Sequence, residues 1–305
     1  MKTIVSSNRL SQLDALRGVI IILMALDHAN SFIAHGKLEP ELWADLFPNY
    51  TGQPSYVFIT RLVTHLAAPG FFFLMGVGMV LLANSRRQRG WSEGQIARHL
   101  LVRGGLLILL QFLLENPAWA WGNVMTDTTY FGVLYALGGA MIIGVLFLRL
   151  PQRWLVGLSA ALVIGTPLLL PEVRTGFAAY SLPLRLWLLP GFSGNVLVLY
   201  PIIPWLGVMG LGMGYAKGGI LKDEGGTAAY RLALWLGTSA LVLFAGLRWW
   251  GGLGNIRPPV GGDWVGFLNL VKYPPSLTFL LLTLGVNLVL LALLARLPVG
   301  WLRPL

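Results

Sequence analysis

Long apolar runs separated by short polar segments dominate the chain. An α-helix needs about 20 apolar residues to cross the roughly 30 Å of bilayer hydrocarbon, and an open strand there would leave its peptide groups unpaired. We therefore expect an all-α, polytopic bundle of transmembrane helices. The pattern predicts eight spans, at about residues 16–34, 57–83, 100–115, 129–149, 152–170, 196–216, 228–249 and 273–296. The third is short unless the amphipathic segment 92–99 extends it.

Basic residues gather in alternate polar segments. Placing the N-terminus in the cytoplasm puts most of the 22 Lys and Arg residues on the cytoplasmic side, as the positive-inside rule requires. The net charge of +10 is therefore an orientation signal, and we expect no nucleic-acid partner. The first outer loop is acidic by contrast, with Glu39, Glu41 and Asp45. No linker or second soluble domain interrupts the pattern, so residues 1–305 are expected to form one domain.

Composition removes several kinds of chemistry. The chain is 56% hydrophobic and has no cysteine, which excludes disulfides, thiolate nucleophiles and Cys-ligated metals. It has four histidines and no H-E-x-x-H motif, so no metal site is expected. Small residues recur at helical spacing. The glycine-rich segment among them is not expected to be a nucleotide-binding loop, because no predicted strand precedes it. The small residues predict close helix packing at Gly132, Ala136, Ala140, Gly207, Gly210, Gly212 and Gly214.

The first span carries the strongest candidate chemistry. Arg17 and His28 are eleven residues apart, so they share one helix face within roughly 20° and are separated by about 16 Å along it. Asp27 precedes His28, and charged residues inside a membrane are costly and usually functional. Adjacent side chains point about 100° apart, so another helix should receive Asp27. Asp14, three residues before Arg17, could form a local ion pair with it.

Polar groups on the next two spans complete the candidates. Arg61 and His65 lie four residues apart on the second span, where His65 could reach the depth of His28. A neutral imidazole can take a proton from a hydroxyl or amine, or attack an acyl group itself. A purely structural His65, and an Arg61 that only pairs with Asp27, stay open. The remaining candidates for substrate contacts are Asn30 on the first span and Gln111 and Glu115 on the third.

Two motifs resemble a known family. The first is Arg-Leu-x-x-Leu-Asp-x-Leu-Arg-Gly at 9–18, followed by Leu-Met-x-x-Asp-His at 23–28; the second is the segment 60–76. They are similar to the transmembrane acyltransferase superfamily, and within it to the bacterial branch related to the heparan-α-glucosaminide N-acetyltransferase catalytic domain. The similarity extends more loosely over nearly the whole chain, including 200–214. The sister branch of O-acyltransferases shares an Arg, ten residues and then a His, a pattern that falls here on Arg17 and His28.

The resemblance implies an enzyme of a bacterial inner (cytoplasmic) membrane that moves an acyl group, with acetyl expected, from cytoplasmic acyl-CoA to an extracytoplasmic sugar or amino sugar. It implies that His28 is catalytic, with Asp27 and His65 as further candidates, and that Arg17 holds the CoA end. The other candidates for CoA contacts are Asp14, Arg86 and Arg87. The candidates for acceptor contacts are Arg61, Asn30, Glu115 and Gln111.

Several alternatives stay open. In animal members the active histidine follows the first helix, where this chain has His35. The family continues beyond an eighth helix, so a truncated or shortened member is expected. A proton-coupled transporter or flippase using Asp27, His28 and His65 is the first rival, and a non-catalytic membrane scaffold is the second. The expected partners are the lipid bilayer, acyl-CoA and the glycan acceptor; a homodimer is left open.

Overall fold

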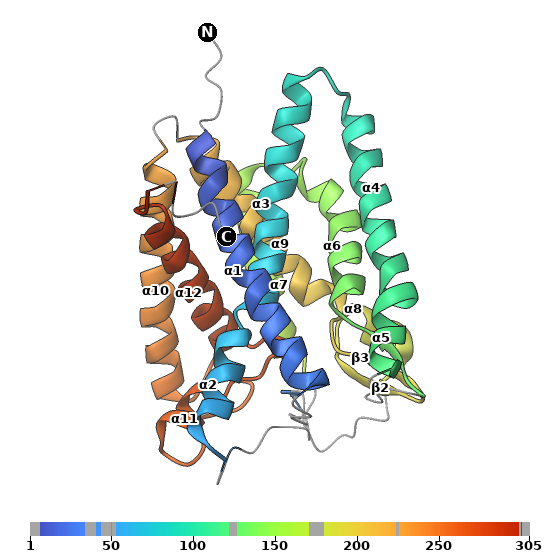
Figure 1. Ribbon diagram of the computed structural model, residues 1–305, viewed down its shortest axis with the longest axis vertical. Helices are drawn as coiled ribbons and strands as arrows, with labels where there is room; N and C mark the ends of the chain where they lie inside the picture. The colour runs from blue at the N-terminus through green and yellow to red at the C-terminus, as the bar shows by residue number, and fades with distance from the viewer. Residues whose placement is uncertain are drawn as a thin grey trace.

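The computed structural model describes residues 7–33, 41–43, 50, 53–121, 127–170, 180–223, 226–298 and 300. Its longer helices lie side by side along the long axis of the molecule (Figure 1). The helices are α1 (Ser7–Phe32), α2 (Ser55–Thr64), α3 (Ala67–Gln88), α4 (Glu93–Leu110), η1 (Gln111–Glu115), α5 (Asn116–Trp121), α6 (Val133–Phe147), α7 (Gln152–Leu168), α8 (Leu182–Trp187), α9 (Ile202–Tyr215), η4 (Ala216–Ile220), α10 (Ala228–Trp250), α11 (Trp264–Leu268) and α12 (Leu277–Leu294).

Five stretches of helix in the described part of the chain are long and apolar enough to cross a membrane. They are Ser11–Phe32, Ser55–Gln88, Glu93–Trp121, Ala228–Trp250 and Leu277–Leu294. The protein is thus a mostly helical integral membrane protein, as expected. The other three predicted spans coincide with the shorter helices α6, α7 and α9, and their crossing of the membrane stays a prediction.

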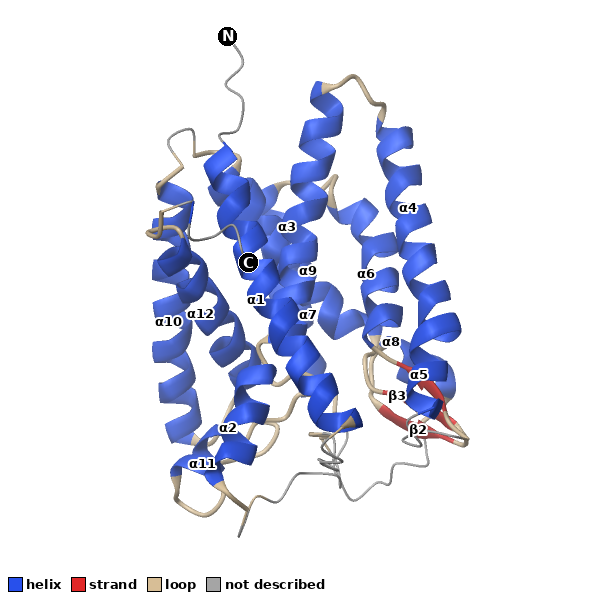
Figure 2. Cartoon of the chain, in the orientation of Figure 1, coloured by secondary structure: helices blue, strands red, loops and turns tan. Residues whose placement is uncertain are grey.

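A small sheet at one end of the bundle departs from the purely helical prediction (Figure 2). Its strands are β1 (Thr129–Phe131), β2 (Gly191–Ser193) and β3 (Val196–Val198), in the order β1-β3-β2. β3 pairs parallel to β1 and antiparallel to β2. The residues of β1 and β3 were assigned to the fourth and sixth spans, so the helices α6 and α9 begin later than predicted, at Val133 and Ile202.

The second predicted span is two helices that meet at a break. His65 and Leu66 separate α2 from α3. Pro69 lacks the backbone N–H that would bond the carbonyl of His65 in a continuous helix, which explains the interruption. The Leu66 carbonyl accepts a hydrogen bond of 3.1 Å from the N–H of Gly70 and one of 3.0 Å from Nδ2 of Asn287 on α12. The break is therefore braced by a neighbouring helix.

The start of α4 confirms that segment 92–99 extends the third span. The Ser92 hydroxyl accepts from the N–H of Gln95 at 3.2 Å, and the Gln95 side chain accepts from the N–H of Ser92 at 2.8 Å. This reciprocal capping box satisfies N–H groups that a helix start leaves unpaired. The helix then continues through the π-helical turn η1 into α5.

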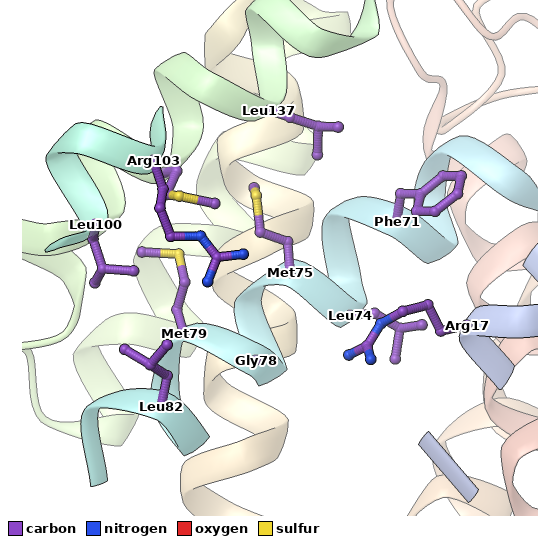
Figure 3. A pocket seen from close by; sticks show the side chains of 11 residues that line it. Arg17, Phe71, Leu74, Met75, Gly78, Met79, Leu82, Leu100, Arg103 and Leu137 are labelled. Carbon is purple, nitrogen blue, oxygen red and sulfur yellow. The ribbon is translucent and has the colours of Figure 1, made fainter. Parts of the chain in front are cut away.

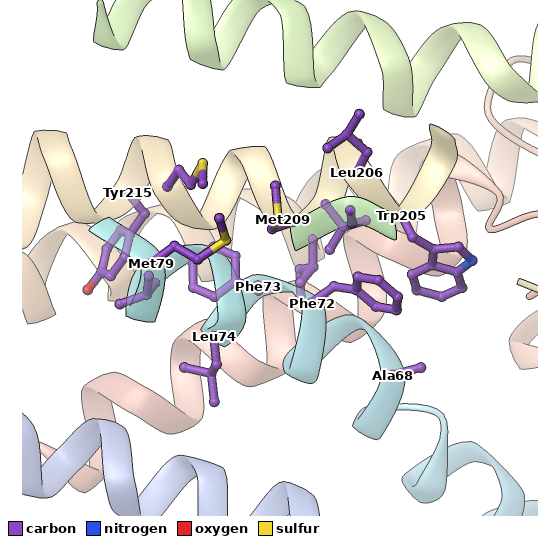
Figure 4. Packing of buried hydrophobic residues seen from close by; sticks show 14 of the residues in the cluster. Ala68, Phe72, Phe73, Leu74, Met79, Trp205, Leu206, Met209 and Tyr215 are labelled. Carbon is purple, nitrogen blue, oxygen red and sulfur yellow. The ribbon is translucent and has the colours of Figure 1, made fainter. Parts of the chain in front are cut away.

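Helix α9 lies at the centre of the bundle and packs through glycines, as the small-residue pattern predicted. A Cβ on Gly212 would collide with the backbone carbonyl of Phe73 on α3, and one on Gly76 of α3 would collide with the carbonyl of Met209. Figure 4 shows the side chains of α3 and α9 interleaving around this contact. Trp205, which is fully buried, stacks on Phe72 with ring centroids 4.8 Å apart. The two helices thus touch backbone to backbone, which only glycine permits.

Candidate functional site

Asp27 and His28 point toward different neighbours. The Asp27 carboxylate accepts hydrogen bonds of 2.8 Å from Nη1 of Arg61 and 2.8 Å from the hydroxyl of Thr64, both on α2. The imidazole of His28 packs instead against Trp119 of α5, with ring centroids 5.6 Å apart. The prediction that another helix receives Asp27 is confirmed, and so is its pairing with Arg61.

Glu41 is the centre of this polar cluster and is fully buried. Nε and Nη2 of Arg61 each donate to one of its carboxylate oxygens at 2.7 Å. Nε2 of His65 lies 3.1 Å from Oε1 of the same carboxylate. The backbone N–H groups of Lys272 and Tyr273 donate to the Glu41 carbonyl, at 3.2 and 3.1 Å. Segment 41–43 is therefore fixed against the residues that precede α12.

The electrostatics of the cluster favour an ionised Glu41. Burial alone would raise the pKa of its carboxyl group, but the Arg61 guanidinium and the His65 ring hold that pKa well below its ordinary value. Two carboxylates, Asp27 and Glu41, thus share one guanidinium. Lys272 supplies a second positive charge near Asp27. Sequence reasoning placed Glu41 only in an acidic loop; the available signal was that Arg61 and His65, on one helix face, required an anionic partner.

His28 is held in one tautomer. Its Nδ1 lies 2.8 Å from the carbonyl oxygen of Met24. A carbonyl only accepts, so Nδ1 carries the hydrogen and the neutral ring keeps a lone pair on Nε2. Among the described residues no hydrogen bond to Nε2 is found. This nitrogen can therefore accept a proton or act as a nucleophile.

Glu115 supports the aromatic wall beside His28. Its carboxylate accepts hydrogen bonds from the side chain of Trp119 and from the backbone of Leu134. Its Oε2 is buried without a hydrogen-bond partner in the described part of the chain. Glu115 thus orients the ring on which His28 packs and keeps one acceptor oxygen available.

Two further candidate residues lie on the same helices as His28 and Glu115. The side chain of Gln111, fully buried, donates to Asn116 Oδ1 at 3.1 Å and to the Tyr130 carbonyl at 3.2 Å, and accepts from the N–H of Tyr135 at 3.2 Å. It therefore joins the α4–α5 helix to β1 and α6. Asn30 lies half-buried, two residues beyond His28 on α1.

Arg17 lies at a pocket of about 520 Å³ between α1, α3, α4 and α6 (Figure 3). Only two of the eleven lining residues, Arg17 and Arg103, have polar side chains. The lining residues are Arg17, Phe71, Leu74, Met75, Gly78, Met79, Leu82, Leu100, Arg103, Leu137 and Met141. The pocket could hold an elongated, mostly apolar ligand that carries negative charge.

The other residues assigned to CoA contacts make local ion pairs or ring contacts. Asp14 Oδ1 lies 2.6 Å from Nη1 of Arg17, and both side chains are about half-exposed, so the predicted local ion pair is confirmed. Arg87 pairs with Glu93 at 2.6 Å, and the Arg86 guanidinium lies 4.4 Å from the centre of the Trp91 ring. Neither Arg86 nor Arg87 lines the pocket.

The two histidines have separate surroundings. The His65 ring contacts Glu41 and the ring of Phe279, at 5.5 Å between centroids, whereas the His28 ring contacts Trp119 and Phe32. His35 lies outside the described residues. Within the described ranges, no three His, Asp or Glu side chains come together as a metal site would need.

Comparison with known proteins shows the family of the chain. The family described as heparan-alpha-glucosaminide N-acetyltransferase, catalytic, matches residues 9–245. The mouse (Mus musculus) heparan-alpha-glucosaminide N-acetyltransferase is 31% identical over 134 residues, which is 44% of this chain and 18% of that protein. The human (Homo sapiens) protein of the same name is 30% identical over 131 residues, 43% of this chain and 17% of that protein. The aligned part is thus less than a fifth of either relative. The family match covers most of the chain, which therefore belongs to the heparan-alpha-glucosaminide N-acetyltransferase catalytic-domain family.

Proposed function

We propose that the protein is a membrane-embedded acyltransferase that moves an acetyl group from acetyl-CoA to a sugar or amino sugar across the cytoplasmic membrane of a bacterium. The cytoplasm holds the donor at the end of the bundle where α1 begins, and the acceptor lies near the opposite end. The family match supports the reaction class. The curated relatives' names support an amino-sugar acceptor.

One geometric observation carries the proposal. Arg17 and His28 both face the helix formed by α4, η1 and α5: Arg17 shares its pocket with Leu100 and Arg103, and His28 packs on Trp119. They lie about 16 Å apart along α1. That separation is on the order of the length of a pantetheine arm. A donor held at Arg17 could therefore present its thioester toward His28.

The residues then supply acid–base or nucleophilic chemistry. Nε2 of His28 takes the proton from the acceptor amine or hydroxyl while the acceptor atom bonds to the acetyl carbon. The thioester C–S bond breaks, and the sulfur leaves with the proton as free CoA. Alternatively Nε2 itself attacks the acetyl carbon, the thioester C–S bond breaks and CoA leaves as its thiolate. The acetyl-imidazole then passes its acetyl group to the acceptor in a second step, and the acceptor's proton goes to the departed thiolate or to water. The two routes differ in whether the enzyme is acetylated.

We assign the acceptor to the side of His28 that Glu115 and Trp119 form. The partnerless Oε2 of Glu115 can accept a hydrogen bond from an acceptor hydroxyl or amine. Asn30 and Arg61 are further candidate contacts, although the Arg61 guanidinium already binds Glu41 and Asp27.

Transfer of radiolabelled acetyl from acetyl-CoA to glucosamine by the purified protein tests the proposal. Wild-type protein should transfer, and His28→Ala should lose roughly a hundredfold or more of the rate, as expected for a general base. His99→Ala is the matched control, because His99 lies on α4 with its ring against Trp91. Equal rates for His28→Ala and wild type would refute the role of His28. Mass spectrometry after a single turnover without acceptor distinguishes the two routes.

The transporter alternative gains no support from the site. Asp27 is engaged by Arg61 and Thr64, His65 by Glu41, and His28 by Met24. A proton relay through Asp27, His28 and His65 would have to bridge these separate partners. Acetyl transfer that proceeds without a proton gradient would exclude the relay as a requirement.

A further inference from the structure

We propose that Arg103 binds the phosphate groups of the acyl-CoA donor, opposite Arg17 in the same pocket; this inference rests on the proposed function. Counting charge along the sequence assigned Arg103 only to the orientation signal. The structure gives it a specific position, on the wall of the pocket that α4 provides.

The direction of the side chain is the first observation. Figure 3 shows the Arg103 guanidinium extending from α4 toward Met75 and Met79 of α3, while Arg17 lies on the far side, beyond Leu74. α1 and α4 begin at the same end of the bundle (Figure 1). Arg17 and Arg103 each lie ten residues beyond the first residue of their helix, about 15 Å along its axis. The two cations therefore stand at similar depth.

The lack of a counter-charge is the second observation. In the described part of the chain no hydrogen bond or ion pair to the Arg103 guanidinium is found, and no carboxylate lines the pocket. Arg17, in contrast, has Asp14 as a partner. Arg103 is exposed, so its guanidinium is accessible to an anionic ligand in the pocket and can form charge-assisted hydrogen bonds with it.

The shape and chemistry of the pocket select the kind of anion. A guanidinium presents a planar fork of N–H donors that matches two phosphate oxygens. The apolar remainder of the wall, rich in methionine, suits a flexible chain such as a pantetheine arm. A ligand with phosphates at one end and an apolar arm therefore satisfies both parts of the lining. Acyl-CoA has this structure, and a phospholipid is the other source of the same chemistry.

The test compares ligands with and without phosphate. Calorimetry in detergent would measure binding of CoA and of pantetheine, which lacks the nucleotide phosphates, to wild type, Arg103→Ala, Arg103→Lys and Arg98→Ala. Arg98 is the matched control because it is an exposed arginine of α4 that does not line the pocket. Arg103→Ala should bind CoA roughly tenfold to a hundredfold more weakly, with pantetheine binding unchanged. The CoA affinity of Arg103→Lys should lie between those of wild type and Arg103→Ala, and the CoA affinity of Arg98→Ala should equal that of wild type.

The other outcomes contradict the inference in distinguishable ways. Arg103→Ala that binds CoA as wild type does would refute the contact. Equal weakening for CoA and pantetheine would show that Arg103 supports the pocket structure instead. Loss of co-purified anionic lipid with unchanged CoA affinity would assign the guanidinium to a lipid headgroup. Wild type that transfers acetyl without dependence on Arg103 refutes this inference alone. Wild type that binds CoA through Arg103 yet transfers nothing refutes the proposed function alone, and no CoA binding refutes both.

Discussion

Arg61 binds Glu41 through two parallel hydrogen bonds of 2.7 Å, from Nε to one carboxylate oxygen and from Nη2 to the other. The third arm of the same guanidinium, Nη1, reaches Asp27 on α1. One side chain thus joins α2, the first helix and segment 41–43. Because Glu41 is fully buried, each member of this group depends on the others for compensation of its charge.

Removal of the guanidinium should therefore destabilise the protein strongly. Arg61→Met leaves Glu41 buried without its main partner, and a broken buried pair costs about 3–5 kcal/mol of unfolding free energy. Arg61→Lys should recover only part of the lost unfolding free energy, because an ammonium group cannot form the two parallel hydrogen bonds of the guanidinium. Thermal unfolding in detergent measures both. Arg17→Ala is the control, since its exposed pair with Asp14 is worth about 0–1 kcal/mol. Equal melting temperatures for Arg61→Met and Arg17→Ala would contradict the argument.

The Glu41 carboxyl gives a prediction for pH. Its pKa is held well below the ordinary 4.5, so its ionised form stabilises the folded state. That contribution is complete above the unfolded pKa of about 4.5 and is lost as pH falls below it toward the folded pKa. Glu41→Gln cannot titrate. The gap in melting temperature between wild type and Glu41→Gln should stay constant from pH 7 to pH 5 and narrow below about pH 4.5. A gap that is constant through that range would show that Glu41 does not titrate as described.

Gly78 offers a way to fill the donor pocket without disturbing the bundle. A Cβ at Gly78 would meet nothing within 4 Å, and the residue lines the pocket. Gly78→Leu should weaken acetyl-CoA binding roughly tenfold or more, by occupying space, with little change in melting temperature. Gly105→Leu, equally unobstructed but outside the pocket, is the control. Gly76→Leu should instead unfold readily, because it faces the Met209 carbonyl. If Gly78→Leu binds acetyl-CoA normally, the donor lies elsewhere.

Trp119 should affect the catalytic rate through His28. Trp119→Leu removes the ring on which the imidazole packs and the indole that binds Glu115, so His28 loses its fixed position. A misplaced catalytic group lowers kcat roughly tenfold to a hundredfold. KM for acetyl-CoA should stay unchanged, because Trp119 does not line the donor pocket. Trp121→Leu, two residues later and almost fully exposed, is the matched control. A rise in KM with unchanged kcat would indicate a donor contact instead.

Hydropathy and helix geometry predicted the parts of this molecule that depend on local sequence. The rise and period of α1 gave the expectation that Arg17 and His28 share one helix face, because both quantities are fixed within one helix. The amphipathic pattern of segment 92–99 likewise indicated an extension of the third span, whereas the capping box at Ser92 was not predicted. The glycines of α9 predicted close helix packing, but they did not predict which helix each glycine contacts.

The features that escaped prediction depend on contacts between distant segments. Glu41 reaches Arg61 because its backbone pairs with Tyr273, more than 200 residues away, and no local pattern encodes that pairing. The strands β1 and β3 are three residues long, too short for an alternating pattern to be recognised. Arg103 was assigned only to the cytoplasmic positive charge. Its position in the sequence does not show which residues of other helices form a pocket with it. Pro69 indicated the break before α3, but the continuous apolar run around it led to the prediction of a single span.

The shared guanidinium also constrains how this protein can change over evolutionary time. Loss of Arg61 alone leaves the Glu41 and Asp27 carboxylates without their guanidinium partner. Loss of Glu41 alone leaves the guanidinium and the His65 ring without their acceptor. Each single step passes through a poorly stable intermediate, whereas joint replacement by neutral residues of similar volume does not. Positions 27, 41, 61 and 65 should consequently be inherited as a set, so that members of the family either carry the whole arrangement or have exchanged it together.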